Sequence, residues 1–375
     1  MARWYQCAPH SSPQVRALVR AGANAHTFLC GESSEPSEKL VGFGRDLLVK
    51  ICGVRDPDAA VHAARSGADL VGLILVPGSA RHVSGAAAHA VTAALRAFRE
   101  QQDPAPLLAE FLPPPTLAAE ALSPKGAVLR LAAGAAALQS AARRARPLSV
   151  GVFMNQSPAE VLAAALEARV DIVQLHGHEV PADFYGFPLP IVKVLHVPVA
   201  AAGAVSSDAE DASGALASGI VDWGAVAAAV LMDSTATLAS PSGGSGLVFE
   251  HDTSFAAAER ALHQLAVARP VPSNDSLTPS QVTLPILMAG GLTPENIDAA
   301  LGSLSRRLQG VTGASSGSSL DLDTACLFHL QLCGVDVSSG VEAAGAPKGT
   351  KDPERVSAFV SRAKTAQAAG VPPRS

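Results

Sequence analysis

Short apolar runs alternate with longer amphipathic stretches along most of this chain. The runs are rich in Val, Ile and Leu, and several are followed by Gly or Asn, a pattern typical of buried strands that end in a turn. Eight candidate strands share these features, at residues 49–53, 69–75, 149–155, 171–177, 191–197, 228–234, 285–291 and 334–340. Because helical patterns separate them, we expect an α/β protein whose eight parallel strands close into a (β/α)8 barrel, the TIM barrel.

Helix-starting residues support this alternation. Asp56-Pro57 predicts a helix that Gly67 ends, and Ser157-Pro158 and Thr293-Pro294 open further helices in the same way. The alternative fold is an open doubly wound sheet. That fold would place a Gly-x-Gly-x-x-Gly turn after the first strand, and none is present there.

Four connections are longer than a barrel needs. Residues 100–147 are rich in Ala and Pro, and residues 200–222, 267–284 and 303–333 are rich in Ala, Ser and Gly. This composition predicts flexible, low-complexity insertions rather than domains. The first and last lead into strands, so we expect them to lie far from the carboxyl ends of the strands. The expected organisation is an N-terminal extension of residues 1–48, a barrel of residues 49–365 and a tail of residues 366–375.

Composition narrows the class of protein. The 375 residues are 48% hydrophobic and 16% charged, which favours a large core over disorder, and the formal net charge of −5 gives no basic surface for nucleic acid. No apolar run approaches the length of a membrane span, about 20 residues. Five cysteines, odd in number and without a Cys-x-x-Cys pair, predict a reducing compartment, and we expect a cytoplasmic location. The run from His176 to Glu179 resembles a metal cluster, but no second cluster supports it, so we expect no metal.

Three polar side chains occur at or after predicted strand ends. Cys52 ends the first strand, either as a buried apolar side chain or as a reactive thiol at the end where (β/α)8 barrels place their chemistry. Asp233 ends the sixth strand, either as a helix cap or as a functional carboxyl group. Arg81 follows the second strand, either as an exposed residue or as the partner of a substrate carboxylate.

Two glycine-rich turns fall after strands seven and eight, where these barrels bind phosphate through backbone N–H groups. The first contains Gly290 and Gly291, and the second contains Ser338, Ser339 and Gly340. Together they predict a phosphorylated ligand. A further Gly-rich segment, residues 243–246, is a candidate mobile loop over the site.

Residues 49–365 resemble the phosphoribosylanthranilate isomerase family of tryptophan biosynthesis. The resemblance covers every strand end except the fifth, in the family's order, and rests on residues 50–53, 79–84, 151–155, 174–177, 232–234, 243–246, 289–292 and 336–342. It implies an aldose–ketose isomerase, an intramolecular oxidoreductase that needs no cofactor. The implied substrate is a small phosphorylated molecule, N-(5-phosphoribosyl)anthranilate, which undergoes an Amadori rearrangement.

The resemblance also implies roles for individual residues. Asp233 would be the general acid, Cys52 the general base, and Arg81 the residue that holds the anthranilate carboxylate. The pKa of Asp233 must then be raised from about 3.9, and that of Cys52 lowered from about 8.5. Asp336 would orient the amine or a water, or make a structural hydrogen bond. His176 faces the same end, and we expect it to pack and hydrogen-bond there.

Three positions depart from the family pattern. Ala80 and His82 stand where Pro and Tyr are usual, and Leu247 stands where the loop after strand six commonly has Lys. The loss of this Lys is expected to loosen loop closure or the phosphate contact. Two other functions remain open. One is a non-catalytic phosphate-binding barrel, and the other is a fragment of a bifunctional indole-glycerol-phosphate synthase and isomerase.

The N-terminal extension has two interpretations. Arg3, Arg16 and Arg20 precede the first acidic residue, Glu32, which is typical of a transit segment and would imply a plastid location. Alternatively, the extension resembles the last unit of indole-glycerol-phosphate synthase. The resemblance rests on a helix opened by Ser12-Pro13-Gln14, a strand at residues 23–30 and the turn Gly31-Glu32-Ser33. We therefore expect fusion or association with that synthase, and neither nucleic acid nor a membrane as a partner.

Overall fold

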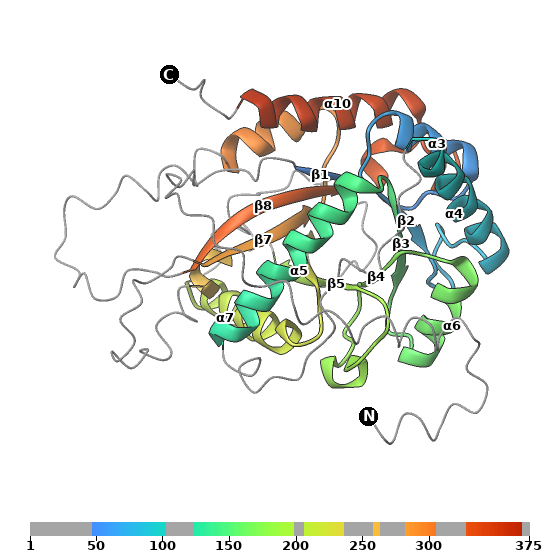
Figure 1. The fold of residues 1–375 in the computed structure, drawn as a ribbon. Coiled ribbons are helices and arrows are strands. Elements are labelled where there is room, and N and C mark those ends of the chain that lie inside the picture. Colours follow the sequence, from blue (N-terminus) through green and yellow to red (C-terminus); the bar gives the residue numbers. More distant parts are fainter. Residues whose placement is uncertain are drawn as a thin grey trace, which may run out of the picture.

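Eight parallel strands close into one barrel in the order of the chain, as expected (Figure 1). The computed structural model describes residues 47–102, 124–198, 206–235, 258–262, 282–304 and 328–369. The strands are β1 Leu48–Ile51, β2 Leu70–Ile74, β3 Leu148–Phe153, β4 Ile172–Leu175, β5 Ile191–Pro198, β6 Ala229–Thr235, β7 Val282–Ala289 and β8 Phe328–Val337. Each of the eight predicted strands overlaps one of them.

The predicted boundaries fail mainly at the eighth strand. It begins at Phe328 rather than at residue 334, and it ends at Val337, so that Ser339–Val341 form the short 3-10 helix η5. Phe328, Leu330 and Leu332 alternate with other residues in a strand pattern. The prediction nevertheless includes these residues in the insertion at residues 303–333. Closure of the barrel pairs β1 with β8, which places Lys50 beside Asp336.

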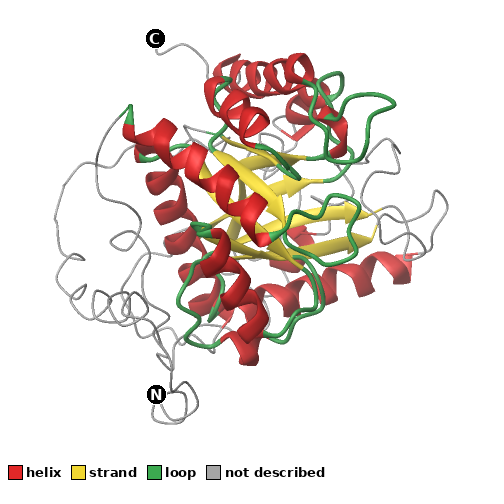
Figure 2. Ribbon diagram, turned by 90° about the vertical axis from the view of Figure 1, so that its right-hand side faces the viewer, coloured by secondary structure: helices red, strands yellow, loops and turns green. Residues whose placement is uncertain are grey.

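Helices surround the strands on the outside of the barrel (Figure 2). They include α3 Pro57–Arg65, α4 Gly85–Glu100, α6 Pro158–Ala168, α7 Ser206–Gly224 and α10 Pro353–Ala369, with the 3-10 helix η3 at Pro181–Phe184 and helical turns at residues 258–262 and 297–304. The predicted caps of α3 and α6 are present. Asp56 accepts from the Ala59 N–H at 2.8 Å, and Ser157 and Glu160 form a capping box.

Two predicted insertions contain packed helices, so the prediction that they are flexible is wrong there. Helix α5, Pro124–Arg144, occupies the second half of residues 100–147, and α7 occupies most of residues 200–222. Both segments are rich in Ala, which has the highest helix propensity, so an Ala-rich composition fits a packed helix as well as a low-complexity insertion. The predicted helix after Thr293-Pro294 begins at residue 297 instead, behind a turn.

Helix α5 covers the amino-terminal end of the barrel. Its residues Ala135, Leu138, Ala141 and Ala142 form one apolar cluster with inward-facing residues at the strand starts, among them Leu48, Leu70, Leu148 and Ala229. The helix contacts β6, β7 and α7, and in Figure 1 it runs across β7. As expected for residues 100–147, this segment lies at the end of the barrel opposite the carboxyl ends of the strands.

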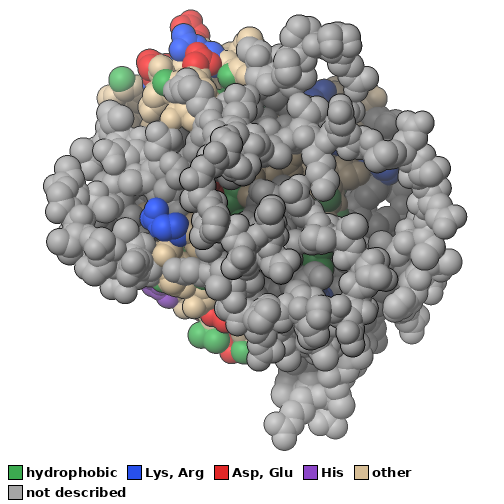
Figure 3. Space-filling view, turned by 90° about the vertical axis from the view of Figure 1, so that its left-hand side faces the viewer, with side chains coloured by type: hydrophobic (Ala, Val, Ile, Leu, Met, Phe, Trp, Pro, Cys, Tyr) green, Lys and Arg blue, Asp and Glu red, His purple; other side chains and the backbone are tan. Residues whose placement is uncertain are grey.

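The remaining parts of the chain add three facts. Helix α10 continues past residue 365, the expected end of the barrel, to Ala369. Among the described residues, no helix combines the length and the apolarity that crossing a membrane requires. On the face drawn in Figure 3, the described charged side chains lie in small separate groups of both signs. The N-terminal extension up to residue 46 and the predicted loop at residues 243–246 lie outside the described residues.

Candidate active site

The carboxyl ends of five strands bring titratable side chains into the mouth of the barrel. Cys52 follows β1, Asp336 lies near the end of β8, and Asp233 lies in β6. His196 of β5 pairs in register with Asp233, and His176 directly follows β4. The structure therefore gathers at one end the three residues Cys52, Asp233 and Asp336 that the sequence predicts as site residues.

Lys50 lies between the thiol and the carboxyl group of Asp336. Its Nζ donates to Asp336 Oδ2 at 2.7 Å, and the lysine is only 1% exposed. Gly72 of β2 leaves room for this arrangement, because a Cβ at that position would lie 2.7 Å from Cys52 Sγ and 3.1 Å from Lys50 Nζ. Sulfur, ammonium and carboxylate thus form one buried group across β1, β2 and β8.

The pKa of Cys52 is raised, not lowered, which corrects the sequence-based expectation. Burial is the main cause, and the nearby Asp336 carboxylate adds to it. Lys50 and Lys351 act in the opposite direction and lower the pKa of this thiol, but they do not outweigh burial. The sequence placed the thiol correctly but gave no measure of its desolvation.

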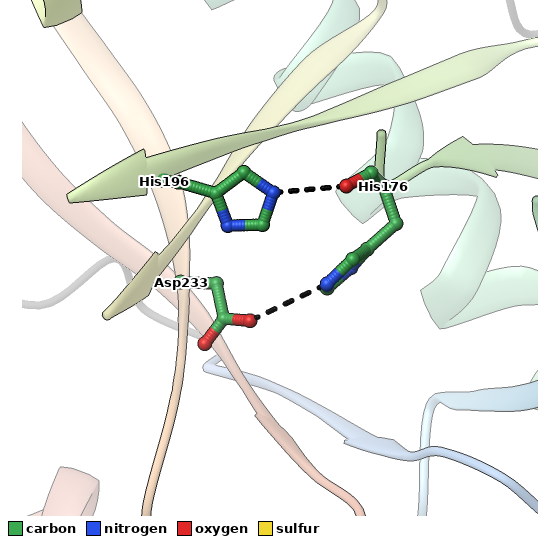
Figure 4. Close-up of side chains that lie close together, drawn as sticks. All are labelled: His176, His196 and Asp233. Carbon is green, nitrogen blue, oxygen red and sulfur yellow. Dashed lines mark hydrogen bonds and ion pairs between the residues drawn. The ribbon is translucent and has the colours of Figure 1, made fainter. Parts of the chain in front are cut away.

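The pKa of Asp233 is raised to about 6, as expected for a general acid. Burial is the largest cause; Asp336 also raises it, while His196 and Lys50 lower it. Figure 4 shows the carboxyl group of Asp233 directed toward His176, whose Nε2 lies 3.6 Å from Asp233 Oδ2. Burial, with His196 and two lysines nearby, lowers the pKa of His176 to about 4, so this imidazole is neutral near pH 7.

Arg81 is not an exposed surface residue. Its Nε and Nη2 donate to the two oxygens of Glu342 at 2.6 and 3.1 Å, and its side chain is 13% exposed. A Cβ on Gly53 would lie 3.1 Å from Arg81 Cδ and 3.0 Å from Ser338 Oγ. The guanidinium is therefore held beside Cys52 and the turn after β8. Its hydrogen bonds to described residues leave the Nη1–Nη2 edge for a second carboxylate.

The two predicted glycine turns lie side by side. Gly290 and Gly291 both have positive φ, of 102° and 61°, and a Cβ on Gly340 would collide with the carbonyl oxygen of Leu292. Ser338 Oγ is buried and has no hydrogen-bond partner among the described residues. Because buried polar atoms are rarely unpaired, this hydroxyl is suited to a polar ligand.

Several polar residues of the site were missed by sequence reasoning. His196, Lys193 and the buried Gln174 all lie on β4 or β5, and the fifth strand end carried no recognised motif. Val192, Val194 and His196 alternate along one face of β5, and the first two belong to the inner cluster. This alternation is the signal that would have placed His196 in the mouth of the barrel.

The fold and the site together define a parallel (β/α)8-barrel protein with a buried thiol and two carboxyl groups at the carboxyl ends of its strands. The sequence matches the family described as N-(5'phosphoribosyl)anthranilate (PRA) isomerase over residues 129–268 and 273–362, more than half of the chain. The chain belongs to this family. Asp233 and Asp336 lie within the matched residues, whereas Cys52 and Arg81 precede them.

Individual relatives agree with this assignment. A tryptophan biosynthesis protein of Phytophthora nicotianae is 32% identical over 84% of this chain and 47% of its own length. A multifunctional tryptophan biosynthesis protein of Phanerodontia chrysosporium is 30% identical over 93% of this chain and 38% of its own length. This chain therefore spans less than half of these two curated relatives.

A shorter relative and a solved structure match over nearly their whole length. The N-(5'-phosphoribosyl)anthranilate isomerase of Neisseria meningitidis is 28% identical over 85% of this chain and 97% of its own length. The crystal structure of phosphoribosyl anthranilate isomerase from Thermotoga maritima is 21% identical, covering 85% of this chain and 99% of that one, with a TM-score of 0.47.

Proposed function

We propose that this protein is a phosphoribosylanthranilate isomerase, which converts N-(5-phosphoribosyl)anthranilate into 1-(2-carboxyphenylamino)-1-deoxyribulose 5-phosphate. The observation that carries the proposal is the meeting of Cys52 and Asp233 at one end of the barrel. Lys50 and Asp336 influence the pKa values of both groups, so both lie close to the same buried ion pair. Family membership supports the same reaction.

The acid step belongs to Asp233. A pKa of about 6 leaves roughly a tenth of the carboxyl groups protonated at pH 7, which is enough for a general acid. The carboxyl proton goes to the furanose ring oxygen, the bond from C1 to that oxygen breaks, and the nitrogen lone pair forms a Schiff base. Asp233 is only 8% exposed, so its carboxyl group is largely shielded from bulk water.

The base step belongs to Cys52. The thiolate removes the proton from C2 of the Schiff base, the electron pair moves toward nitrogen, and an enolamine results that tautomerises to the ketone. Because burial raises the pKa of Cys52, the thiolate depends on Lys50 and Lys351, the two cations that lower it. Lys50 is thus a positioning residue for the base.

Binding groups lie around this pair. The Nη1–Nη2 edge of Arg81 is suited to the anthranilate carboxylate, and the adjacent turns at Gly290-Gly291 and Ser338–Gly340 are suited to the phosphate. Glu342 fixes the Arg81 guanidinium in place and is itself held by the Gly349 N–H at 3.0 Å. The sites for the two anionic ends of the substrate are therefore built on separate elements.

The test is a turnover assay that follows loss of the substrate's anthranilate fluorescence. We expect Cys52→Ser and Asp233→Asn each to lower kcat by at least about 100-fold, since each removes one proton-transfer group. Cys333→Ala is the matched control. Cys333 is also buried and free, but it belongs to the apolar cluster at the other end of the barrel, and we expect near-normal kcat.

Two results would contradict the proposal. Near-normal kcat in either variant would remove the assigned role of that residue. Saturable binding of the substrate without turnover by the unaltered protein would favour the non-catalytic phosphate-binding barrel. Loss of turnover in Cys333→Ala together with loss of secondary structure would make that variant unsuitable as a control, and Cys333→Val would replace it.

Relatives of this chain include multifunctional tryptophan biosynthesis proteins, of which it covers only a part. We propose indole-glycerol-phosphate synthase as the covalent or associated partner, supported by the resemblance of residues 12–33 to the end of that enzyme. Sequencing of the transcript upstream of Met1 tests this proposal. A synthase barrel in the same reading frame is the expected result, and a stop codon followed by an unrelated gene would contradict fusion.

A further inference from the structure

Three potential metal ligands converge beside the acid–base pair. One ligand atom from each of His176, His196 and Asp233 lies within 4.8 Å of the other two (Figure 4). Two imidazoles and a carboxylate, contributed by β5, β6 and the end of β4, are a ligand set that zinc uses in open sites with a free fourth position. We propose that His176, His196 and Asp233 bind a divalent transition-metal ion of the Zn²⁺ class, and that this ion inhibits the isomerase by occupying its general acid.

The three ligand atoms need only small movements to surround an ion. Bonds of about 2.0–2.1 Å in tetrahedral geometry separate ligand atoms by about 3.3 Å. His176 Nε2 and Asp233 Oδ2 already lie 3.6 Å apart. The two imidazole rings meet edge to face, with centroids 5.0 Å apart, so side-chain rotations alone bring the third atom closer.

The hydrogen bond of one ring nitrogen of His196 leaves the other ring nitrogen available to bind a metal ion. Its Nε2 lies 2.9 Å from the carbonyl oxygen of His176. A carbonyl oxygen only accepts, so Nε2 carries the proton and Nδ1 keeps its lone pair. Figure 4 shows Nδ1 on the side of the ring that faces Asp233. A backbone carbonyl that fixes the tautomer of a histidine is the usual arrangement behind a metal ligand.

The surrounding charges limit the affinity without excluding a cation. Two buried lysines lie near the three ligands, but each is paired: Lys50 with Asp336 at 2.7 Å and Lys193 with Glu179 at 2.6 Å. Nitrogen ligands favour Zn²⁺, Cu²⁺ or Ni²⁺ over Mg²⁺ or Ca²⁺, which prefer oxygen.

Inhibition follows from the identity of the third ligand. A coordinated Asp233 carboxylate has no proton for the sugar ring oxygen, and the ion fills the space in which that oxygen must lie. Metal and substrate therefore compete. The inhibition rests on the proposed isomerase function, whereas the binding of the ion does not.

The first experiment measures binding without any assay of activity. Apo-protein is dialysed to equilibrium against chelator-buffered Zn²⁺, and bound metal is counted for the unaltered protein, His196→Gln and His89→Gln. We expect His196→Gln to weaken the high-affinity site by about tenfold or more, the scale on which even supporting partners of metal ligands act. His89→Gln removes an imidazole of α4 outside the cluster and should bind Zn²⁺ normally. Equal binding by the unaltered protein and His196→Gln would overturn the site.

The second experiment measures inhibition. Each protein is assayed in a chelating buffer and again at rising free Zn²⁺, so that every variant serves as its own metal-free reference. We expect competitive inhibition of the unaltered protein that a chelator reverses, with a Zn²⁺ midpoint raised by about tenfold or more in His196→Gln. Bound Zn²⁺ that leaves KM and kcat unchanged would overturn the inhibitory role. If the protein has no isomerase activity at all, the dialysis result alone decides whether the site exists.

Discussion

The two buried thiols of the described chain show that placement decides the chemistry of a residue. Burial raises the pKa of both Cys52 and Cys333, the latter to about 12. Cys333 lies in the apolar cluster at the amino-terminal end of the barrel. Cys52 has Lys50 and Lys351 to lower its pKa, so an accessible thiolate is confined to the end that carries Asp233.

Lys50 should control the pH dependence of turnover. In the proposed mechanism the active form combines a protonated Asp233 with an ionised Cys52. Because Cys52 has the higher pKa, the fraction of protein in this form depends on the difference between the two pKa values. Lys50 lowers both pKa values. We expect Lys50→Gln to move both limbs of the kcat/KM profile to higher pH, measured by initial rates across the pH range.

The control for this prediction is Lys193→Gln. Lys193 is also a buried strand lysine with a carboxylate partner, Glu179, but it is not among the groups that shift the pKa of Cys52. Its loss should affect stability and leave the limbs in place. Identical shifts in the two variants would point to general disturbance of the barrel and not to Lys50.

Asp233 should make the protein less stable near neutral pH. Its pKa of about 6 lies above the ordinary value of 3.8, so the folded state binds the proton more tightly than the unfolded state does. The contribution of this group to stability therefore falls as the pH rises from about 4 to about 6, by about 3 kcal/mol in total. We expect Asp233→Asn to be more stable than the unaltered protein at pH 8 and to lose most of that advantage at pH 4.

Urea unfolding at the two pH values measures this difference. Because both proteins contain every other titratable group, effects unrelated to Asp233 cancel in the comparison. A gain of the same size at pH 8 and pH 4 would show that the substitution acts through packing. Under the proposed mechanism the same variant should be nearly inactive, since the substitution removes the proposed general acid.

At the scale of elements, strands were predictable and some helices were not. Short apolar runs identify β5 and β6 within two residues of their observed bounds, because strands that are buried on both faces are apolar at successive positions. Helix α5 gives no such signal, since its Ala residues suit either environment. Cys52, Asp233 and Asp336 were predictable because they stand at strand ends in motifs, whereas the raised pKa of Cys52 depends on burial that emerges only in the closed barrel.

Gly134 should be required for α5 to lie against the barrel. A Cβ at this position would collide with the carbonyl oxygen of Ala228, immediately before β6. We expect Gly134→Ala to destabilise the protein by about 1–3 kcal/mol, although Ala favours helix, because backbone atoms must move apart. Chemical denaturation with circular dichroism measures the change.

Gly214 of α7 is the matched control, since a Cβ there would meet nothing within 4 Å. Gly214→Ala should stabilise by about 0.5–1 kcal/mol through helix propensity alone. Opposite signs at two helical glycines would show that contact and not propensity decides the effect. Stabilisation of both variants would mean that α5 does not approach β6 so closely.

At the scale of the whole molecule, closure of the barrel holds the first strand, β1, in place at both of its ends. The pairing of β1 with β8 places Lys50 beside Asp336 at the carboxyl end. At the other end, Lys364 of α10 donates to Asp69 Oδ2 at 2.6 Å and to the Leu47 carbonyl oxygen at 2.7 Å. The first strand is thus fixed at both ends, by the site and by the last helix.

This arrangement predicts how much of the chain the barrel requires at its start. A chain trimmed to begin at Leu47 keeps β1, Cys52 and the hydrogen bond from Lys364 to the Leu47 carbonyl oxygen. We therefore expect it to retain the melting temperature and kcat of the full chain. A chain that begins at Val54 lacks β1 and leaves the edges of β2 and β8 unpaired, which should abolish cooperative unfolding. Calorimetry and the fluorescence assay on the three chains decide the matter. Lower stability or turnover in the chain that begins at Leu47 would show that residues before it belong to the barrel, against the boundary expected near residue 48.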